Sequence, residues 1–388
     1  MKAWLRPFPL LRSATLIGLA ALTVVVTIAS MRLTSLPFQF DFKGDLFDAA
    51  RAIVGGQNPY HPQLIQHEVN ILRAGGVFPV VASPRYPPLL MLATIPFTWL
   101  GFGPASVLFF VLSLASVVIA LRLLGVSDWR CLALALVSVP TVFGSWIGNV
   151  SALLLLGTAI TWRCRSHLNR LPIATAGVIV AKLFLWPLAI WLLVTRRYRQ
   201  LAMTAGLVLV AGLGSWAAIG FAGLTGYPHL LVNIAYLGEL RGSSLVTALL
   251  ATGMSAFAAR LLALSVAAML FAAASWLWRT EDGDERAFGL VVVAALLSSP
   301  VVWVHSMVFL YVPVALMSRR LSLLWFIPGF ATGWANLSVG LELALPLVLC
   351  TPLLQVAVRR PAALWRPAQS QLRRLRLALV AAGSQLGL

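Results

Sequence analysis

Two aspartates stand close together just after the first long apolar segment of the chain. Asp41 lies between Phe40 and Phe42, and Asp45 follows four residues later. A carboxylate placed among aromatic side chains is suited to accept a proton as a general base. The structural alternatives are an interface residue or helix cap for Asp41, and for Asp45 a cap on the helix that it begins. The sequence therefore offers two candidate bases, Asp41 and Asp45.

Three other side chains could bind an anion. Lys182 lies inside an apolar run, where a charge usually faces a cavity, although its long side chain could instead reach an interface. Arg85 stands at the rigid turn 86–88, where its fixed charge suits a phosphate or, alternatively, a lipid headgroup. His305 ends an apolar run beside Trp303 and could bind a ligand or serve as a structural donor. These residues predict an anion site.

Motifs for other kinds of chemistry are absent from the sequence. It contains no P-loop, dinucleotide fingerprint or nucleophile elbow. His61 and the His67-Glu68 pair lack the spacing of metal ligands. Three cysteines are too far apart for a disulfide framework or a metal knuckle: Cys131, Cys164 and Cys350. We therefore expect neither a metal nor a cofactor.

The composition indicates a membrane protein. Hydrophobic residues make up 60% of the 388 residues and charged residues only 10%, whereas soluble proteins carry about 25% charged residues. The net charge of +18 would suggest nucleic acid in a soluble protein. Here the basic residues cluster in short loops between apolar runs, as the positive-inside rule predicts. We predict an all-α transmembrane bundle of about 10–13 membrane segments, surrounded by lipid and without a nucleic-acid partner.

Apolar periodicity and basic loops predict the topology. The first apolar run resembles a signal peptide, but its length and the many later runs favour an uncleaved helix with a cytoplasmic N-terminus. Arginines near 163–170, 196–199, 319–320 and 359–360 should face the cytoplasm. Clear spans are expected at 14–31, 104–121, 130–144, 148–163, 200–222, 260–278, 287–303, 305–318, 321–338 and 341–358.

Three regions are interrupted in ways that do not fit simple crossings. Segment 171–194 has basic flanks on both sides and is broken by Lys182 and Pro187, yet its 24 residues cannot cross twice. Prolines interrupt 86–121, and Gly253 and Arg260 interrupt 244–278. We predict that each region enters the bilayer without spanning it. Irregular backbone at that depth requires protein or water around it, which predicts a polar cavity.

The longest polar segment, 32–85, follows the first span and should form an outer loop. Its pattern predicts a helix from Asp45 to Val54, ended by Gly55-Gly56, and then a second amphipathic stretch. The first of these helices should rest on the membrane surface, with Asp48 stabilising its first turn. Residues 1–360 then form one transmembrane domain, and 361–388 form a basic amphipathic cytoplasmic tail on anionic lipid.

Five short pieces occur in a specific order. AARAIVGGQNPY follows Asp41, and the others are YPPLLMLATIP at 86–96, GNVSALLL at 148–155, AKLFLWPL at 181–188 and SPVVWVH at 299–305. Together they resemble glycosyltransferase family 87, whose members are membrane mannosyl- and arabinofuranosyltransferases that use polyprenyl-phosphate sugars. The resemblance implies a GT-C fold. It also implies a glycolipid or cell-envelope polysaccharide as acceptor, and a reaction on the outer, periplasmic side of the cell membrane.

The resemblance also implies roles for individual residues. Asp41 or Asp45 would take the proton of the acceptor hydroxyl, and His305 would hold the donor phosphate. The aromatic residue that often follows the family's aspartate by four positions is missing, because Asp45 occupies that place. The expected donor-phosphate site is Arg85, Lys182 and His305, and the expected pocket residues are Tyr86, Asn149 and Trp303.

Two other classes of protein remain as alternatives. A lipid or glycolipid transporter also places broken helices around charges at the midplane. The sequence has no internal repeat, however, and its polar residues gather toward the outer face. A non-catalytic scaffold would not require Lys182 inside an apolar run.

Overall fold

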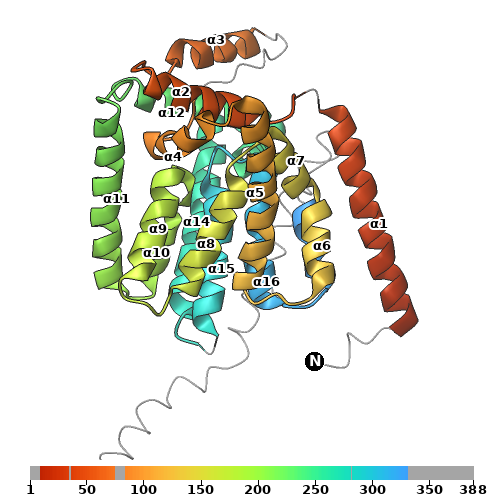
Figure 1. Ribbon diagram of the computed structural model, residues 1–388. Coiled ribbons are helices and arrows are strands. Elements are labelled where there is room, and N and C mark those ends of the chain that lie inside the picture. Colours follow the sequence, from red (N-terminus) through yellow and green to blue (C-terminus); the bar gives the residue numbers. More distant parts are fainter. Residues whose placement is uncertain (1–8, 35, 75–83, 281, 331–388) are drawn as a thin grey trace, which may run out of the picture.

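The structure is a computed structural model that describes residues 9–34, 36–74, 84–280 and 282–330. Every regular element within these ranges is a helix (Figure 1), which confirms the all-α prediction. The expected span at 341–358 and the second part of the expected span 321–338, residues 331–338, lie outside the described residues. So do Cys350, the arginines at 359–360 and the tail 361–388.

Within the described ranges, four helices are long and apolar enough to cross a membrane: α1 (Pro9–Leu33), α5 (Phe102–Leu123), α11 (Tyr198–Ala218) and α14 (Ala256–Leu277). A rise of about 1.5 Å per residue takes a helix of some 20 residues across a hydrocarbon core of about 30 Å. A fifth span is the pair α6 (Trp129–Val137) and α7 (Val139–Ile147), if counted together, since these helices meet at a bend of 54°. We expected one straight span at 130–144. The chain bends instead because Ser138 is extended and Pro140 begins a new helix.

The centre of the bundle is α15 (Gly283–Ser298), which is buried along nearly its whole length. It packs against α14, α10 (Pro187–Val194) and α16 (Tyr311–Met317), and α8 (Ser151–Arg163) packs against α5. The helix expected at 287–303 ends at Ser298, since Pro300 lacks an N–H group and disfavours helix before it. After an extended stretch, the chain continues as the tight helix η3 (Val304–Leu310), and the described part ends with η4 (Leu323–Phe326) and α17 (Ile327–Phe330).

Segment 171–194 forms a hairpin that returns to the end of the bundle where it began. Its parts are α9 (Arg170–Ala181), the short turn η2 (Leu183–Leu185) and α10. Arg165, before α9, lies 3.9 Å from the Asp284 carboxylate, and Arg197, after α10, lies 2.7 Å from it. Because one carboxylate contacts both flanks, the segment enters the bundle without crossing it, as predicted. Lys182 is at the tip of this hairpin, where the backbone is extended.

The other two interrupted regions differ from the prediction. In each, only the leading helix is too short to cross, and these short helices are α4 (Pro88–Thr98) and α13 (Leu245–Ala251). The helices that follow them, α5 and α14, are long enough to span. These two helices agree with the spans expected at 104–121 and 260–278, whereas the prediction that the whole of 86–121 and of 244–278 fails to span was wrong.

The arginine-rich loops meet at one end of the bundle, here called the basic end. Arg319 lies 3.6 Å from Glu285 and would contact a side chain at Gly125. Arg196 lies over the ring of Trp278. The loops expected to share one side of the membrane are thus neighbours.

The opposite end is covered by shorter helices that lie across it (Figure 1). They are the π-helical turn η1 (Phe42–Phe47), α2 (Asp48–Val54), α3 (Pro62–Arg73) and α12 (Tyr227–Arg241). The helix does end at Gly55, as expected. It begins before Asp45, however, so the prediction that Asp45 caps it was wrong: Asp45 is buried within the helical run. Asp48 forms an ion pair with Lys43 at 2.6 Å.

Replacing Asp284 by alanine is expected to loosen the hairpin. The carboxylate accepts hydrogen bonds from both terminal nitrogens of Arg197 and from the Trp191 indole. Since the pair is partly exposed, we expect a loss of about 1–2 kcal/mol in unfolding free energy. The measurement is the thermal unfolding midpoint in detergent. Glu285→Ala, which removes only the looser contact to Arg319, is the matched control. Equal unfolding midpoints for the two variants would contradict the role of Asp284 in holding the two ends of the hairpin together.

Candidate functional site

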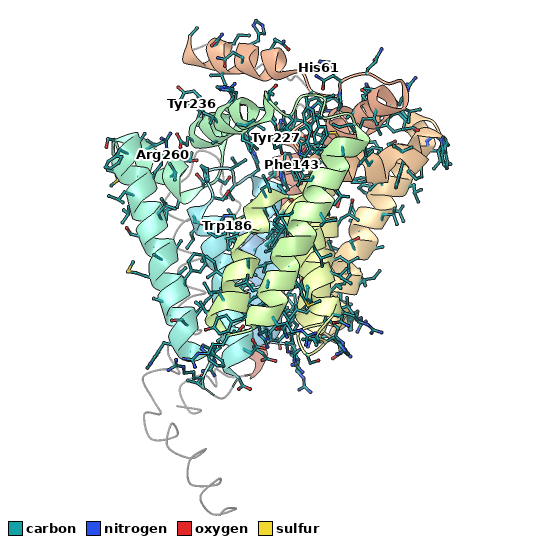
Figure 2. The ribbon with its side chains drawn as sticks, turned by 90° about the vertical axis from the view of Figure 1, so that its left-hand side faces the viewer. His61, Phe143, Trp186, Tyr227, Tyr236 and Arg260 are labelled. Atoms are coloured by element: carbon teal, nitrogen blue, oxygen red, sulfur yellow. The ribbon has the colours of Figure 1, made fainter. Side chains whose placement is uncertain are left out.

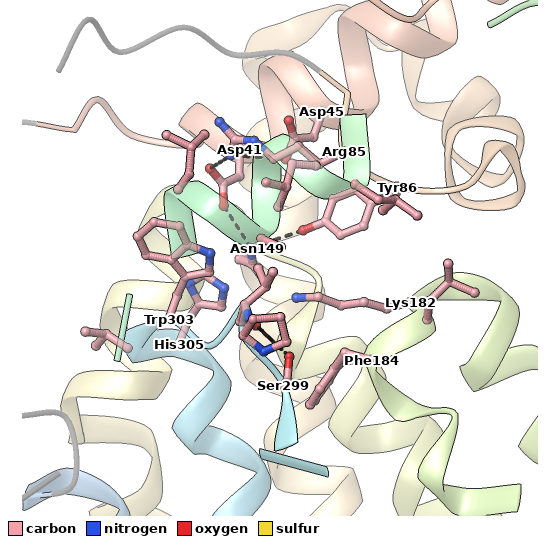
Figure 3. Close-up of a pocket in the computed structure, with 18 of the residues that line it drawn as sticks. Asp41, Asp45, Arg85, Tyr86, Asn149, Lys182, Phe184, Ser299, Trp303 and His305 are labelled. Carbon is pink, nitrogen blue, oxygen red and sulfur yellow. Dashed lines mark hydrogen bonds and ion pairs between the residues drawn. The ribbon is translucent and has the colours of Figure 1, made fainter. Parts of the chain in front are cut away.

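A cavity of about 570 Å³ lies near the end opposite the basic end (Figure 3). Segments far apart in the sequence contribute to it, from η1, the turn before α4, the turn after α7, the hairpin tip, α12 and the segment before η3. All eight residues proposed from the sequence line this one cavity: Asp41, Asp45, Arg85, Tyr86, Asn149, Lys182, Trp303 and His305.

The two carboxylates reach the cavity together because they are four residues apart in one helical run, and such residues share a helix face. The Nη1 atom of Arg85 lies 4.0 Å from Asp41 Oδ1 and 3.8 Å from Asp45 Oδ2. Asp45 is 1% exposed and Asp41 is 7% exposed. Asp41 is therefore the carboxylate that a ligand in the cavity reaches more easily.

Asn149 holds Asp41 in place. Its Oδ1 accepts hydrogen bonds from the backbone N–H and the hydroxyl of Ser151, at 3.0 and 2.8 Å. That fixes the amide orientation, so Nδ2 donates to Asp41 Oδ2 at 2.8 Å and to the Tyr86 hydroxyl at 3.1 Å. Figure 3 shows Asn149 between these two partners.

Gly148 allows the turn that carries Asn149 to approach η1. Its φ is +74°, a left-handed conformation that suits glycine at the end of a helix. A Cβ atom there would lie 2.5 Å from Phe42 Cβ and 2.6 Å from Gln39 Oε1. The glycine in the GNVSALLL piece is thus explained by close contact with the segment bearing Asp41.

Tyr86 keeps its proton in this site. Burial raises the pKa of its phenol well above the usual value, and the charges of Asp45 and Asp41 raise this pKa further. The hydroxyl accepts from Asn149, and because it stays neutral it can also donate toward a ligand.

Two tyrosines that the sequence analysis missed hold the Arg85-Tyr86 segment. The Tyr60 hydroxyl donates to the Tyr86 carbonyl at 2.8 Å, and the Tyr227 hydroxyl donates to the Arg85 carbonyl at 3.4 Å. Tyr60 also stacks on Trp216, with 5.3 Å between the ring centroids. The Asn58-Pro59 pair before it favours a turn, but nothing in the local sequence indicates which partner the Tyr60 hydroxyl reaches.

Replacing Tyr60 by phenylalanine is expected to lower turnover about tenfold, since one hydrogen bond that positions Arg85 and Tyr86 is lost while the ring still packs. The unfolding midpoint should change little. The measurements are thermal unfolding and the turnover of the reaction that the resemblance implies, sugar transfer. Tyr198→Phe, at an exposed position near the basic end, is the control. A Tyr60→Phe enzyme as active as this control would contradict the role.

Lys182 points into the cavity from the hairpin tip (Figure 3). Its ammonium group lies 5.7 Å from the Tyr86 ring centre and 5.6 Å from that of Phe184. Among the described residues no carboxylate lies within 4.0 Å of Lys182 Nζ. Its position agrees with the cavity-facing alternative and not with a side chain that reaches an interface. A cation contacted by rings can attract an anionic ligand.

His305 is 4% exposed, and neither of its ring nitrogens has a hydrogen-bond partner in the part of the chain that the structure describes. Gly144 permits this position, because a Cβ atom there would lie 2.9 Å from His305 Cβ. Buried polar atoms are nearly always hydrogen-bonded. A ligand with hydrogen-bonding groups would supply the missing partner.

The cavity combines the two carboxylates with the basic side chains of Arg85 and Lys182 and a largely apolar wall. Three of the apolar residues that line it are more than 40% exposed: Leu183, Trp186 and Leu264. In the described ranges no three His, Cys, Asp or Glu side chains gather in a way that could hold a metal ion.

These features define a polytopic membrane protein with a buried cavity near one end of its helices that several polar side chains line. The model of glycosyltransferase family 87 matches residues 85–302, more than half of the chain, and the protein belongs to this family. It is thus a membrane glycosyltransferase. No curated protein and no solved structure matches significantly. The matched range includes Arg85, Asn149 and Lys182, whereas Asp41, Asp45 and His305 lie outside it.

Proposed function

We propose that the protein transfers a sugar, mannose or arabinofuranose, from a polyprenyl-phosphate donor to a glycolipid or cell-envelope polysaccharide. The observation that carries this proposal is the meeting of Asp41 with Lys182 and His305 in one cavity. The carboxylate suits an acceptor hydroxyl, and the nitrogen-bearing side chains suit a phosphate. Neither a nucleotide fold nor a metal is required, because the sugar arrives on a lipid and its phosphate leaves as an anion.

Asp41 is the better candidate for the base. It is more accessible than Asp45 and is oriented by Asn149. In the proposed step, the acceptor oxygen forms a bond to the anomeric carbon while its proton passes to Asp41. The bond between that carbon and the phosphate oxygen breaks, and polyprenyl phosphate leaves with the electron pair. Such a displacement inverts the anomeric centre. Asp45 then serves to hold Arg85, 3.8 Å away.

The negative charge that develops on the phosphate needs preorganised stabilisation. Lys182 offers a charge with no carboxylate within 4.0 Å, and His305 offers ring nitrogens without a protein partner among the described residues. Arg85, whose side chain is 25% exposed, can add charge and bidentate hydrogen bonds. These three residues form the proposed phosphate site.

The orientation follows from the positive-inside rule. We place the basic end in the cytoplasm, so the cavity opens toward the periplasmic side of the cell membrane. The polyprenyl chain would leave the cavity past Leu183, Trp186 and Leu264. Figure 2 shows Trp186 about midway along the bundle, below α12.

The test is to incubate the purified protein with labelled polyprenyl-phosphate mannose and arabinofuranose, with and without glycolipid acceptors. Transfer to an acceptor, or slow hydrolysis of one donor, is the expected result. The opposite result is that neither donor reacts and that the protein moves a glycolipid across proteoliposome membranes. That result would favour the transporter class and overturn the proposal.

A further inference from the structure

The residue two positions before Asp41 has an unusual backbone conformation. Gln39 has a φ of +59°, in the left-handed region that a residue with a Cβ atom rarely adopts. It is fully buried, and its carbonyl accepts a hydrogen bond from the backbone N–H of Lys43 at 2.8 Å. Gln39 thus stands at the start of the helical run that carries Asp41 and Asp45. Strained backbone persists only where surrounding contacts hold it, and it is often found at functional sites.

The contacts that hold Gln39 come from the end of α7. Its backbone N–H donates to the Trp146 carbonyl at 2.7 Å, and its side-chain Nε2 donates to the Ser145 carbonyl at 2.6 Å. Carbonyls in the last turn of a helix are available to donors from outside that helix. Gln39 therefore ties the start of the Asp41 run to the end of α7.

These bonds join the two segments from which the Asp41 site is built. Gly148 and Asn149 follow α7 directly, and Asn149 Nδ2 donates to Asp41 Oδ2 at 2.8 Å. The length of that bond depends on how closely the Asp41 run lies against the end of α7. A shift of about 1 Å between the two segments would take the pair out of hydrogen-bonding distance.

Two features of Gln39 are unfavourable for stability. One is its left-handed backbone. The other is its Oε1 atom, which is buried and has no hydrogen-bond partner among the described residues. A glycine would adopt the same φ without strain and would bury no such oxygen. What a glycine lacks is the Nε2 donor, so the bond to the Ser145 carbonyl is the feature that distinguishes glutamine here.

Resting on the proposed function, we propose that Gln39 is a positioning residue for the transfer reaction. Its side-chain bond to the end of α7 sets the place of Asp41 relative to Asn149. Gln39 is not among the residues that line the cavity, so it acts on the reaction through Asp41 and not on a substrate.

The first test replaces Gln39 by asparagine. Asparagine adopts left-handed backbone more readily than most residues. Its side chain is one methylene shorter, however, and no longer reaches the Ser145 carbonyl. We expect single-turnover transfer to fall about 10–10²-fold with donor binding unchanged, because a misplaced catalytic group has an effect of this size. Gln57→Asn makes the same change at an exposed position and should behave as wild type.

A second background separates positioning from folding. The Asp41→Asn protein has no carboxylate at this position to be placed, so adding Gln39→Asn should leave its residual transfer rate unchanged. A loss of folded protein would instead lower the rate by the same factor in both backgrounds. Equal factors in the two backgrounds, or a Gln39→Asn protein as active as Gln57→Asn, would overturn the proposal.

Hydrogen exchange tests the same contact without turnover. The amides of residues 39 and 43 donate to the carbonyls of Trp146 and Gln39. In the Gln39→Asn protein we expect both amides to exchange about tenfold faster, because local opening is easier once a bond is lost. The amides of α15 should keep their wild-type rates.

This measurement also separates the inference from the proposed function. Faster exchange supports the role of Gln39 in holding the Asp41 run even when neither donor reacts, a result that would overturn only the proposed function. Unchanged exchange together with full transfer activity in Gln39→Asn would overturn the inference and leave the proposed function in place.

Discussion

The Asp41→Asn protein is expected to lose about 10³-fold in turnover while binding the donor almost as well as wild type. A positioned general base contributes about 10²–10⁴-fold, and asparagine keeps the size of the side chain while removing its ability to accept the proton. Asn149 donates to Asp41 Oδ2 and can donate equally well to an amide oxygen. The measurement is single-turnover transfer, together with donor binding at equilibrium.

Asp45→Asn is the matched comparison, since it removes the other carboxylate of the same helical run. Asp45 lies 3.8 Å from Arg85 and is less accessible, so we expect about a tenfold loss, from a less well held arginine. A reversed order, with Asp45→Asn inactive and Asp41→Asn active, would make Asp45 the base. Full activity in both variants would contradict the proposed chemistry.

Replacing Lys182 by methionine is expected to lower turnover about 10²–10³-fold. Removal of one preorganised group that stabilises charge in the transition state has an effect of this size. Methionine preserves the length and apolar stem of the side chain. Lys182→Arg should recover part of the activity, because charge is restored with a different shape. The observable is the single-turnover rate at saturating donor, with the donor dissociation constant measured separately.

Lys43→Met is the control for charge alone. Lys43 lies at the end opposite the basic end, and its side chain is 55% exposed and paired with Asp48. Its replacement should therefore change turnover less than twofold. If Lys182→Met changes only stability, or matches the Lys43 variant in rate, Lys182 is a structural residue and the phosphate site has been misplaced.

The parts of the structure set by local sequence were predictable. The hairpin was visible in its two basic flanks and in Lys182 and Pro187, because 24 residues cannot cross a bilayer twice. The end of helix α2 at Gly55 was predictable from the pair Gly55-Gly56. A charge inside an apolar run also made Lys182 a candidate cavity residue.

The parts set by long-range contacts were not predictable. A capping role for Asp45 was a reasonable local choice, but the helical run begins earlier and continues through a π-helical turn that places Asp45 beside Arg85. Tyr60 and Tyr227 act on carbonyls 26 and 142 residues away in sequence. No local pattern specifies such partners, because they arise only when the bundle packs.

The position of Lys182 has a consequence for how the protein tolerates change. Its hairpin is fastened at the basic end of the bundle, where Asp284 binds Arg197 and lies near Arg165. A substitution or a lipid headgroup that competes for those arginines would change the position of the Lys182 side chain. Lys182 lies about 18 Å from them, which is the length of the twelve-residue α9. Residues in the loops of the basic end are therefore constrained by the proposed reaction at the opposite end of the bundle.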